Sequence, residues 1–90
     1  MRITNVKVYL RDEGRLKSYA TVTFDDSFIV KGLKLIMGNK GFFVAMPSKR
    51  MKDGTYRDIA HPINSETRRM IEEAVLAEYE KEVSRKKGER

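Results

Sequence analysis

Two neighbouring segments of the chain alternate apolar and polar residues, which is the pattern of a strand with one buried face. They cover residues 3–10 and 16–24. The apolar positions on the shared face include Val6, Val8, Leu10, Ala20, Val22 and Phe24. The five residues between the segments are polar or charged apart from Gly14. The sequence therefore predicts a β-hairpin whose loop spans residues 11–15.

Turn residues divide the next part of the chain into further strands. A turn at residues 25–27 leads into residues 28–31, and Gly32 then interrupts the pattern before residues 33–37. A glycine inside a strand pattern indicates a bulge or a bend. Residues 38–41 form another turn, which leads into five apolar residues closed by Pro47. The sequence therefore predicts further strands after the hairpin, separated by these turns.

The apolar run is Phe42, Phe43, Val44, Ala45 and Met46. A strand that is apolar on both faces needs cover on both faces. In so small a domain, a helix covers one face and little remains for the other. A twofold-related copy of the chain could supply the second cover, because an exposed apolar strand promotes aggregation. The alternative is a central strand between the helix and a long loop. We favour the first reading, a dimer interface at these five residues.

Length and composition narrow the class of protein. The chain has 90 residues, which suits one small domain. It has no apolar run of about 20 residues that could cross a bilayer, and residues 1–10 lack the features of a signal peptide. We therefore expect a cytoplasmic protein with no membrane partner. With no cysteine, the chain has no disulfide, thiolate metal site or cysteine nucleophile.

Positive charge is spread over most of the chain. The net charge is +6, and only the expected helix body, residues 66–80, is acidic on balance. A basic protein of this size attracts polyanions, most often nucleic acid. The alternative is that the lysines and arginines only keep the surface soluble. Charge alone does not decide between these two interpretations.

The segment after Pro47 predicts a short basic hairpin. Asp53-Gly54 is a strong turn signal, and we expect a type I′ turn with both residues at its centre. The candidate phosphate-binding side chains on its two arms are Lys49, Arg50, Lys52 and Arg57. The alternative is a solvated loop.

The only histidine gives no indication of catalysis. His61 precedes Pro62, so an extended connector is expected there. No metal-binding spacing and no nucleophile motif surrounds it. We therefore predict no catalytic residues, no metal, no cofactor and no small-molecule substrate, and we assign His61 a structural role.

One amphipathic helix follows the connector. Asn64 or Ser65 can cap its start, and Glu66 places an acid in the first turn. Arg68 and Arg69 lie near the positive end of the helix, which disfavours cations. A phosphate or base edge opposite them is one explanation. Pairing with Glu72 and Glu73 at i+4 spacing is the other.

The domain is expected to span residues 1–83, followed by a basic, disordered tail at residues 84–90. The tail loses its apolar content after Val83 and ends in a run of mostly charged residues. Such a tail adds non-specific attraction to polyanions.

Two contiguous strings resemble the SpoVG family, the stage V sporulation protein G or septation regulator group. Residues 43–50 read FVAMPSKR and residues 57–65 read RDIAHPINS, and the likeness runs from about residue 1 to residue 79. The resemblance implies an α+β fold, with a four- or five-stranded antiparallel sheet and a C-terminal helix, that dimerises through the sheet. It also implies binding of DNA, and in some members RNA, in the control of gene expression, septation and sporulation. By position, the family's nucleic-acid contacts fall on Lys49 and Arg50 and on residues 66–71, with Arg68 and Arg69.

These observations together predict a homodimeric α+β nucleic-acid-binding regulator without enzymatic activity. Lys49, Arg50, Lys52 and Arg57 would neutralise phosphates, and Arg68 and Arg69 would reach the backbone or base edges. The competing hypothesis is a protein-protein interaction module of the septation machinery. Such a module would bind partners through the apolar strand, and its basic charge would be incidental.

Overall fold

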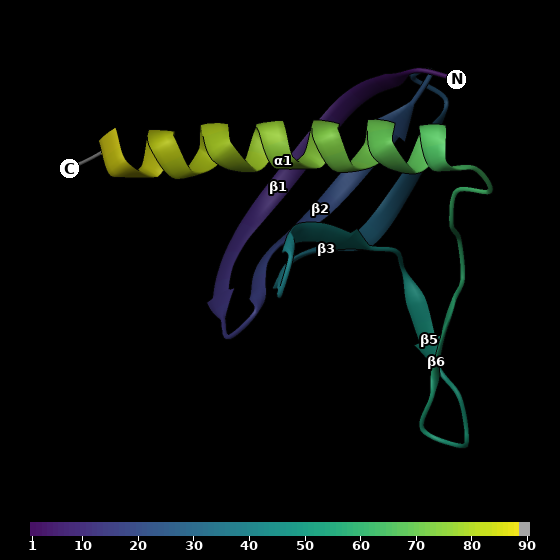
Figure 1. Cartoon of the computed structure of the whole chain (residues 1–90). Coiled ribbons are helices and arrows are strands. Elements are labelled where there is room, and N and C mark those ends of the chain that lie inside the picture. Colours follow the sequence, from purple (N-terminus) through teal and green to yellow (C-terminus); the bar gives the residue numbers. More distant parts are fainter. Residues whose placement is uncertain (89–90) are drawn as a thin grey trace.

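The computed structural model of the chain describes residues 1–88, which form two antiparallel sheets and one long helix (Figure 1). The strands are β1 (Ile3–Glu13), β2 (Leu16–Phe24), β3 (Phe28–Gly38), β4 (Gly41–Ala45), β5 (Ser48–Arg50) and β6 (Tyr56–Asp58), and the helix is α1 (Ser65–Gly88). Strands β1 to β4 form a four-stranded sheet in sequence order, and β5 and β6 form a separate hairpin. The predicted α+β fold is confirmed.

The first hairpin is confirmed, but its strands are longer than the alternation indicates. The register pairs Val8 with Ala20 and Tyr9 with Tyr19, and it continues past a shift to pair Glu13 with Leu16. Residues 11–13 therefore extend β1 and are not part of a loop. The turn is tight because Gly14 adopts a positive φ of 64°.

Gly32 marks a bulge in β3, as its position in the strand pattern predicts. One residue of β2 separates Ala20 from Val22, but two residues of β3 separate their partners Leu33 and Val30. Gly32 has a φ of 82° at this point, a conformation that residues with a side chain rarely adopt. The bulge keeps apolar side chains on one face of the sheet on both sides of the break.

Helix α1 lies across one face of the sheet (Figure 1). Its buried residues Ile71 and Val75 pack into a core with strand residues. The buried strand residues of this core are Ala20, Val22, Phe24, Leu33, Leu35 and Val44, followed by Met46. We call the face under the helix the inner face, and the opposite face the outer face. Because side chains alternate along a strand, the residues between the core positions point to the outer face.

Strand β4 lies at the edge of the sheet and not at its centre. On its inner side Val44 is buried, and the Phe42 ring lies 5.6 Å from the Tyr79 ring of α1. On its outer side Phe43 remains 44% exposed. The helix therefore covers one face of the apolar strand, as expected, and neither the outer side nor the edge is covered by a further strand. The alternative of a central strand is wrong.

Helix α1 continues to Gly88, so residues 84–88 are helical in the structure. The Arg85 guanidinium donates to Glu82 Oε2 at 2.7 Å. Three basic residues in the last turn also suit the negative end of the helix dipole. The amino-acid composition indicated a disordered tail from residue 84, but composition takes no account of this ion pair or of the helix dipole. The last two residues of that predicted tail, Glu89 and Arg90, lie outside the described residues.

Ser18 offers a test of the core. It is completely buried on the inner face, and its Oγ has no hydrogen-bond partner among the described residues. Because this hydroxyl is desolvated without compensation, Ser18→Ala should leave the free energy of unfolding unchanged or raise it by up to about 1 kcal/mol.

The matched control adds a hydroxyl at the neighbouring inner position. Ala20→Ser should lower the free energy of unfolding by about 1–3 kcal/mol, because the new hydroxyl would be buried without a partner. Urea unfolding followed by circular dichroism measures both variants. A clear loss of stability in Ser18→Ala would show that the native hydroxyl is bonded.

Candidate nucleic-acid interface

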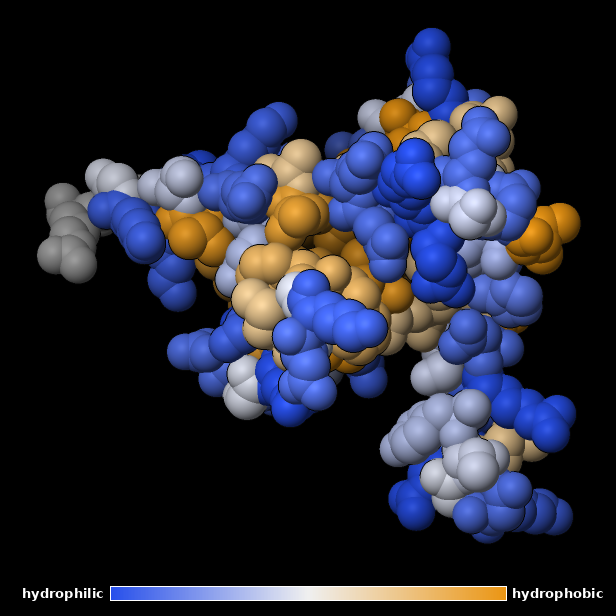
Figure 2. Space-filling model, viewed as in Figure 1, coloured by the Kyte–Doolittle hydropathy of each residue, from blue (hydrophilic) through white to orange (hydrophobic). Residues whose placement is uncertain are grey.

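The β5–β6 hairpin projects from the body of the protein as an arm (Figure 1). We define the arm as residues 48–58, all of which are exposed. At its base, the Ile59 N–H donates to the Pro47 carbonyl oxygen at 2.7 Å. Figure 2 shows the arm as a lobe coated mainly with hydrophilic residues and set apart from the body. Its shape therefore comes from its own hydrogen bonds and not from packing on the sheet.

The arm brings together the four cations that the sequence analysis assigned to it. A single shallow hollow is lined by Lys49, Arg50, Met51, Lys52, Asp53 and Arg57. The register places Lys49 directly opposite Arg57. Like charges in opposed positions of a strand pair repel each other. No carboxylate within residues 1–88 forms an ion pair with any of these four side chains. The hollow therefore carries four cations against one carboxylate, Asp53, and none of the four cations is in an ion pair within residues 1–88.

The turn at the tip of the arm differs from the prediction. The Gly54 N–H donates to the Met51 carbonyl oxygen at 3.0 Å, which places Lys52 and Asp53 at the centre of the turn. Gly54 follows with a φ of 88°, whereas Asp53 is not among the residues of positive φ. The turn has the form of a type I turn followed by a glycine bulge. The expected type I′ turn centred on Asp53 and Gly54 is wrong, although the chain does reverse at this site.

Asp53 explains the choice of turn. Its Oδ1 accepts hydrogen bonds from the Thr55 hydroxyl at 2.6 Å and from the Thr55 N–H at 3.0 Å. These two bonds, first the one from the hydroxyl, lower the pKa of the Asp53 carboxyl below its ordinary value. The single acid at the tip is therefore engaged within the turn, where it fixes the shape that carries Lys52.

The structure places Arg68 and Arg69 at the start of α1. Asn64 caps the helix, because its Oδ1 accepts a hydrogen bond from the Thr67 N–H at 2.7 Å. This confirms one of the two predicted caps. Arg68 is half-buried and Arg69 is exposed. Arg69 lines a hollow together with Glu66 and Glu73.

One of the two explanations for Arg68 and Arg69, i+4 ion pairs with Glu72 and Glu73, is not seen within residues 1–88. Neither Arg68 nor Arg69 has an ion pair with a carboxylate within residues 1–88. Glu72 instead accepts a hydrogen bond from the Val44 N–H at the free edge of β4, with a distance of 3.5 Å. The connector separates the arm from the helix start (Figure 1), so the candidate residues form two basic groups and not one.

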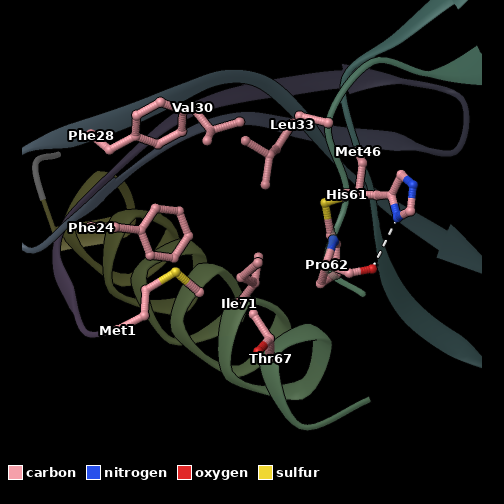
Figure 3. A pocket seen from close by; sticks show the side chains of 11 residues that line it. Met1, Phe24, Phe28, Val30, Leu33, Met46, His61, Pro62, Thr67 and Ile71 are labelled. Carbon is pink, nitrogen blue, oxygen red and sulfur yellow. Dashed lines mark hydrogen bonds between the residues drawn. The ribbon is translucent and has the colours of Figure 1, made fainter. Parts of the chain in front are cut away.

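An apolar cavity of about 170 Å³ lies between the helix start and the inner face of the sheet. Its lining includes Phe24, Leu33 and Ile71 (Figure 3). His61 contributes to the rim, but its Nδ1 lies 3.0 Å from the Pro62 carbonyl oxygen.

The described residues contain no cluster of His, Asp or Glu that could hold a metal ion. They also contain no helix long and apolar enough to cross a membrane.

None of the predicted nucleic-acid-binding residues lies on the outer face of the sheet. In the structure Tyr9 and Tyr19 are directly paired there, and Lys34 is the partner of Tyr19 on the next strand. The alternation of basic and aromatic residues along β1 could have indicated this surface. The residues that stand beside them on β2 and β3, however, depend on the strand register.

The fold and the arm define a small α+β protein in which helix α1 covers one face of the sheet and the basic hairpin projects into solvent. The SpoVG family model matches residues 1–81. The chain belongs to the SpoVG family.

Relatives from distant bacteria carry the name "Putative septation protein SpoVG". The protein from Anaeromyxobacter sp. (strain Fw109-5) is 55% identical over 83 residues, which cover 92% of this chain and 86% of that protein. The protein from Bdellovibrio bacteriovorus is also 55% identical over 83 residues, covering 92% and 77%. The protein from Oceanobacillus iheyensis is 55% identical over 82 residues, covering 90% and 85%.

Asp53 gives a direct test of the arm geometry. Its carboxyl should titrate at a lower pH than an ordinary aspartate, as measured from the Asp53 side-chain carbon by NMR. Since the folded pKa is depressed, the contribution of these bonds to arm stability is present above the ordinary pKa and is lost as the pH falls through the folded pKa.

Two variants of Thr55 separate the effect of its hydroxyl on the Asp53 pKa from the effect of its backbone N–H. Thr55→Val should raise the Asp53 pKa towards its ordinary value, because the hydrogen bond from the Thr55 hydroxyl, the main cause of the lowered pKa, is removed, and Thr55→Ser should keep the pKa low. An unchanged pKa in Thr55→Val would contradict the role of the hydroxyl.

Proposed function

We propose that this protein binds nucleic acid through the arm and the helix start, and acts in the cytoplasm in the control of gene expression linked to septation and sporulation. The observation that carries the proposal is the convergence of Lys49, Arg50, Lys52 and Arg57 on one exposed hairpin without ion pairs in the described chain. Cations without ion pairs bind an anionic partner most favourably, because the phosphates neutralise charges that otherwise repel one another. The names of the relatives support the septation part of the proposal.

The two basic groups have different tasks in this proposal. The arm cations contact phosphates, which position the protein but carry no sequence information. Arg68 and Arg69 extend from a helix start, where an arginine fork can reach base edges as well as the backbone. Binding strength therefore comes mainly from the arm, and sequence preference comes from the helix start.

This division of tasks is testable with single alanine variants. Lys49→Ala should weaken binding to a duplex selected from a random pool and to the unselected pool alike, and should reduce the salt slope by about one. Arg68→Ala or Arg69→Ala should weaken the selected duplex more than the pool. Fluorescence anisotropy over a salt series measures all of these, with Lys40→Ala, in the turn between β3 and β4, as the control.

Equal losses on both duplexes for all three variants would contradict the division of tasks. Negligible affinity for DNA and RNA at low salt would contradict nucleic-acid binding itself. That second result would favour an interaction module of the septation machinery. The exposed apolar side chains of β4 are the observation in favour of such a module.

We also propose that the protein is a homodimer that pairs through β4. This strand is at the sheet edge, and its Phe42 and Phe43 side chains are 37% and 44% exposed. The Val44 N–H already points to the free edge, where it donates to Glu72. A second copy of the strand would offer a backbone carbonyl in place of this carboxylate and would cover the apolar side chains.

A charge on the edge strand tests this interface. Phe43→Lys should shift the protein from twice the monomer mass to the monomer mass, because dimerisation would desolvate the new charge. Sedimentation equilibrium measures the mass, and Ile63→Lys is the control because Ile63 is 90% exposed on the connector. A wild-type protein that sediments as a monomer would contradict the proposal.

A further inference from the structure

The outer face of the sheet carries an aromatic and basic row that the proposed function does not use. The register pairs Tyr9 with Tyr19, Tyr19 with Lys34, and Lys34 with Ala45. The row therefore crosses all four strands, a distance of about 14 Å at the usual spacing of neighbouring strands. Helix α1 does not cover the row, because it packs on the inner face.

The aromatic side chains of the row are available to a partner. Tyr9 is 50% exposed although it lies in the middle of β1. Directly opposed side chains of an antiparallel pair begin about 5 Å apart, so the two tyrosines stand side by side. The Arg11 guanidinium lies 5.5 Å from the centre of the Tyr19 ring. Tyr9 therefore offers an open ring, and the Arg11–Tyr19 pair offers a second stacked surface beside it.

The charges around the row are of one sign. Lys7 and Lys34 are exposed, and Arg11 lies over the row. The acidic residues of β1, Asp12 and Glu13, lie beyond Arg11 at the end of the strand, where Asp12 pairs with Lys17 at 3.6 Å. The row is thus a set of rings framed by cations, which fits a ligand with flat apolar groups joined by anions.

We propose that the outer face is a second binding site, for single-stranded nucleic acid, in which bases stack on Tyr9 and beside the Arg11–Tyr19 pair while Lys7 and Lys34 contact phosphates. Base stacking on exposed aromatic side chains, with cations along the backbone, is the usual basis of single-strand binding. The inference rests on the proposed function for the class of ligand, and it adds a separate surface and a separate form of nucleic acid.

Two physical arguments favour a single strand over other occupants. The faces of paired bases are covered within a duplex, and the major groove admits a helix or a two-stranded ribbon but not a face of four strands. A second copy of the chain on this face would bring Lys7, Arg11 and Lys34 of each copy against the same cations of the other. Pairing along the edge of β4, in contrast, would place a strand beside Phe43 and would leave Tyr9, Tyr19 and Lys34 uncovered.

The first experiment removes the open ring. Oligo(dT) and oligo(U) of about 12 nucleotides and a duplex of the same length serve as probes in fluorescence anisotropy. Tyr9→Thr should lose about tenfold in affinity for the single strands, and should change duplex affinity by less than about twofold. Tyr9→Phe keeps the ring and should bind as the wild type does. Comparison of the two oligonucleotides shows whether RNA or DNA is preferred.

The chain supplies its own reporter, because it has no tryptophan and four tyrosines. Single strands should quench the tyrosine fluorescence of the wild type, and Tyr9→Phe should remove part of this quenching although it binds normally. Lys34→Gln should reduce the salt slope for single strands by about 0.7. Lys40→Gln, in the β3–β4 turn outside the row, should leave it unchanged.

The possible results separate this inference from the proposed function. Unchanged single-strand binding by folded Tyr9→Thr would overturn the outer-face site, whatever the arm variants do on the duplex. Loss by Tyr9→Thr would support it, even if the arm variants have no effect on the duplex and the proposed interface fails. Polyglutamate that competes with oligo(dT) equally well, and depends equally on Tyr9, would overturn it in favour of an acidic protein partner. Absence of binding to every probe at low salt would overturn both proposals.

Discussion

The packing of one helix on one face of a four-stranded sheet is the interaction on which the rest of this structure depends. Ile71 and Val75 of α1 close the inner face over Val22, Leu33 and Leu35. Each buried side chain of this kind contributes about 1.5–3 kcal/mol of hydrophobic free energy. Residues 1–88 contain no second helix that could cover the other face. The outer face, the β4 edge and the arm must therefore be compatible with water, or with a partner.

The alternation of apolar residues was sufficient to predict the inner face, because burial imposes a period of two along each strand. Gly32 and Asn64 were also predictable, since a bulge and a helix cap depend on local backbone chemistry. The outer-face row from Tyr9 to Ala45 could not be predicted from the sequence. Its members are far apart in the sequence, and the bulge at Gly32 decides which residue of β3 stands opposite Tyr19.

Competition between local interactions explains the turn at the arm tip and the helical conformation of residues 84–88. The dipeptide Asp53-Gly54 favours a type I′ turn, but the bonds from Asp53 to Thr55 stabilise a turn one residue earlier. The composition of residues 84–88 suggests disorder, yet the segment contains no proline and begins beside an ion pair with Glu82. In both places a specific side-chain contact outweighs the average preference of the residue types.

Whether the basic groups remain available to an anionic partner depends on what the nearby carboxylates contact. The helix body is acidic, and its carboxylates could have neutralised Arg68 and Arg69. Glu72 is instead directed to the Val44 N–H, because β4 ends under the helix and leaves a free donor there. The same contact would link the two proposed activities. A strand that pairs with β4 would release Glu72 towards Arg68, and only Met46 and Pro47 separate β4 from the basic arm. Dimerisation and nucleic-acid binding would then act on neighbouring parts of one continuous segment.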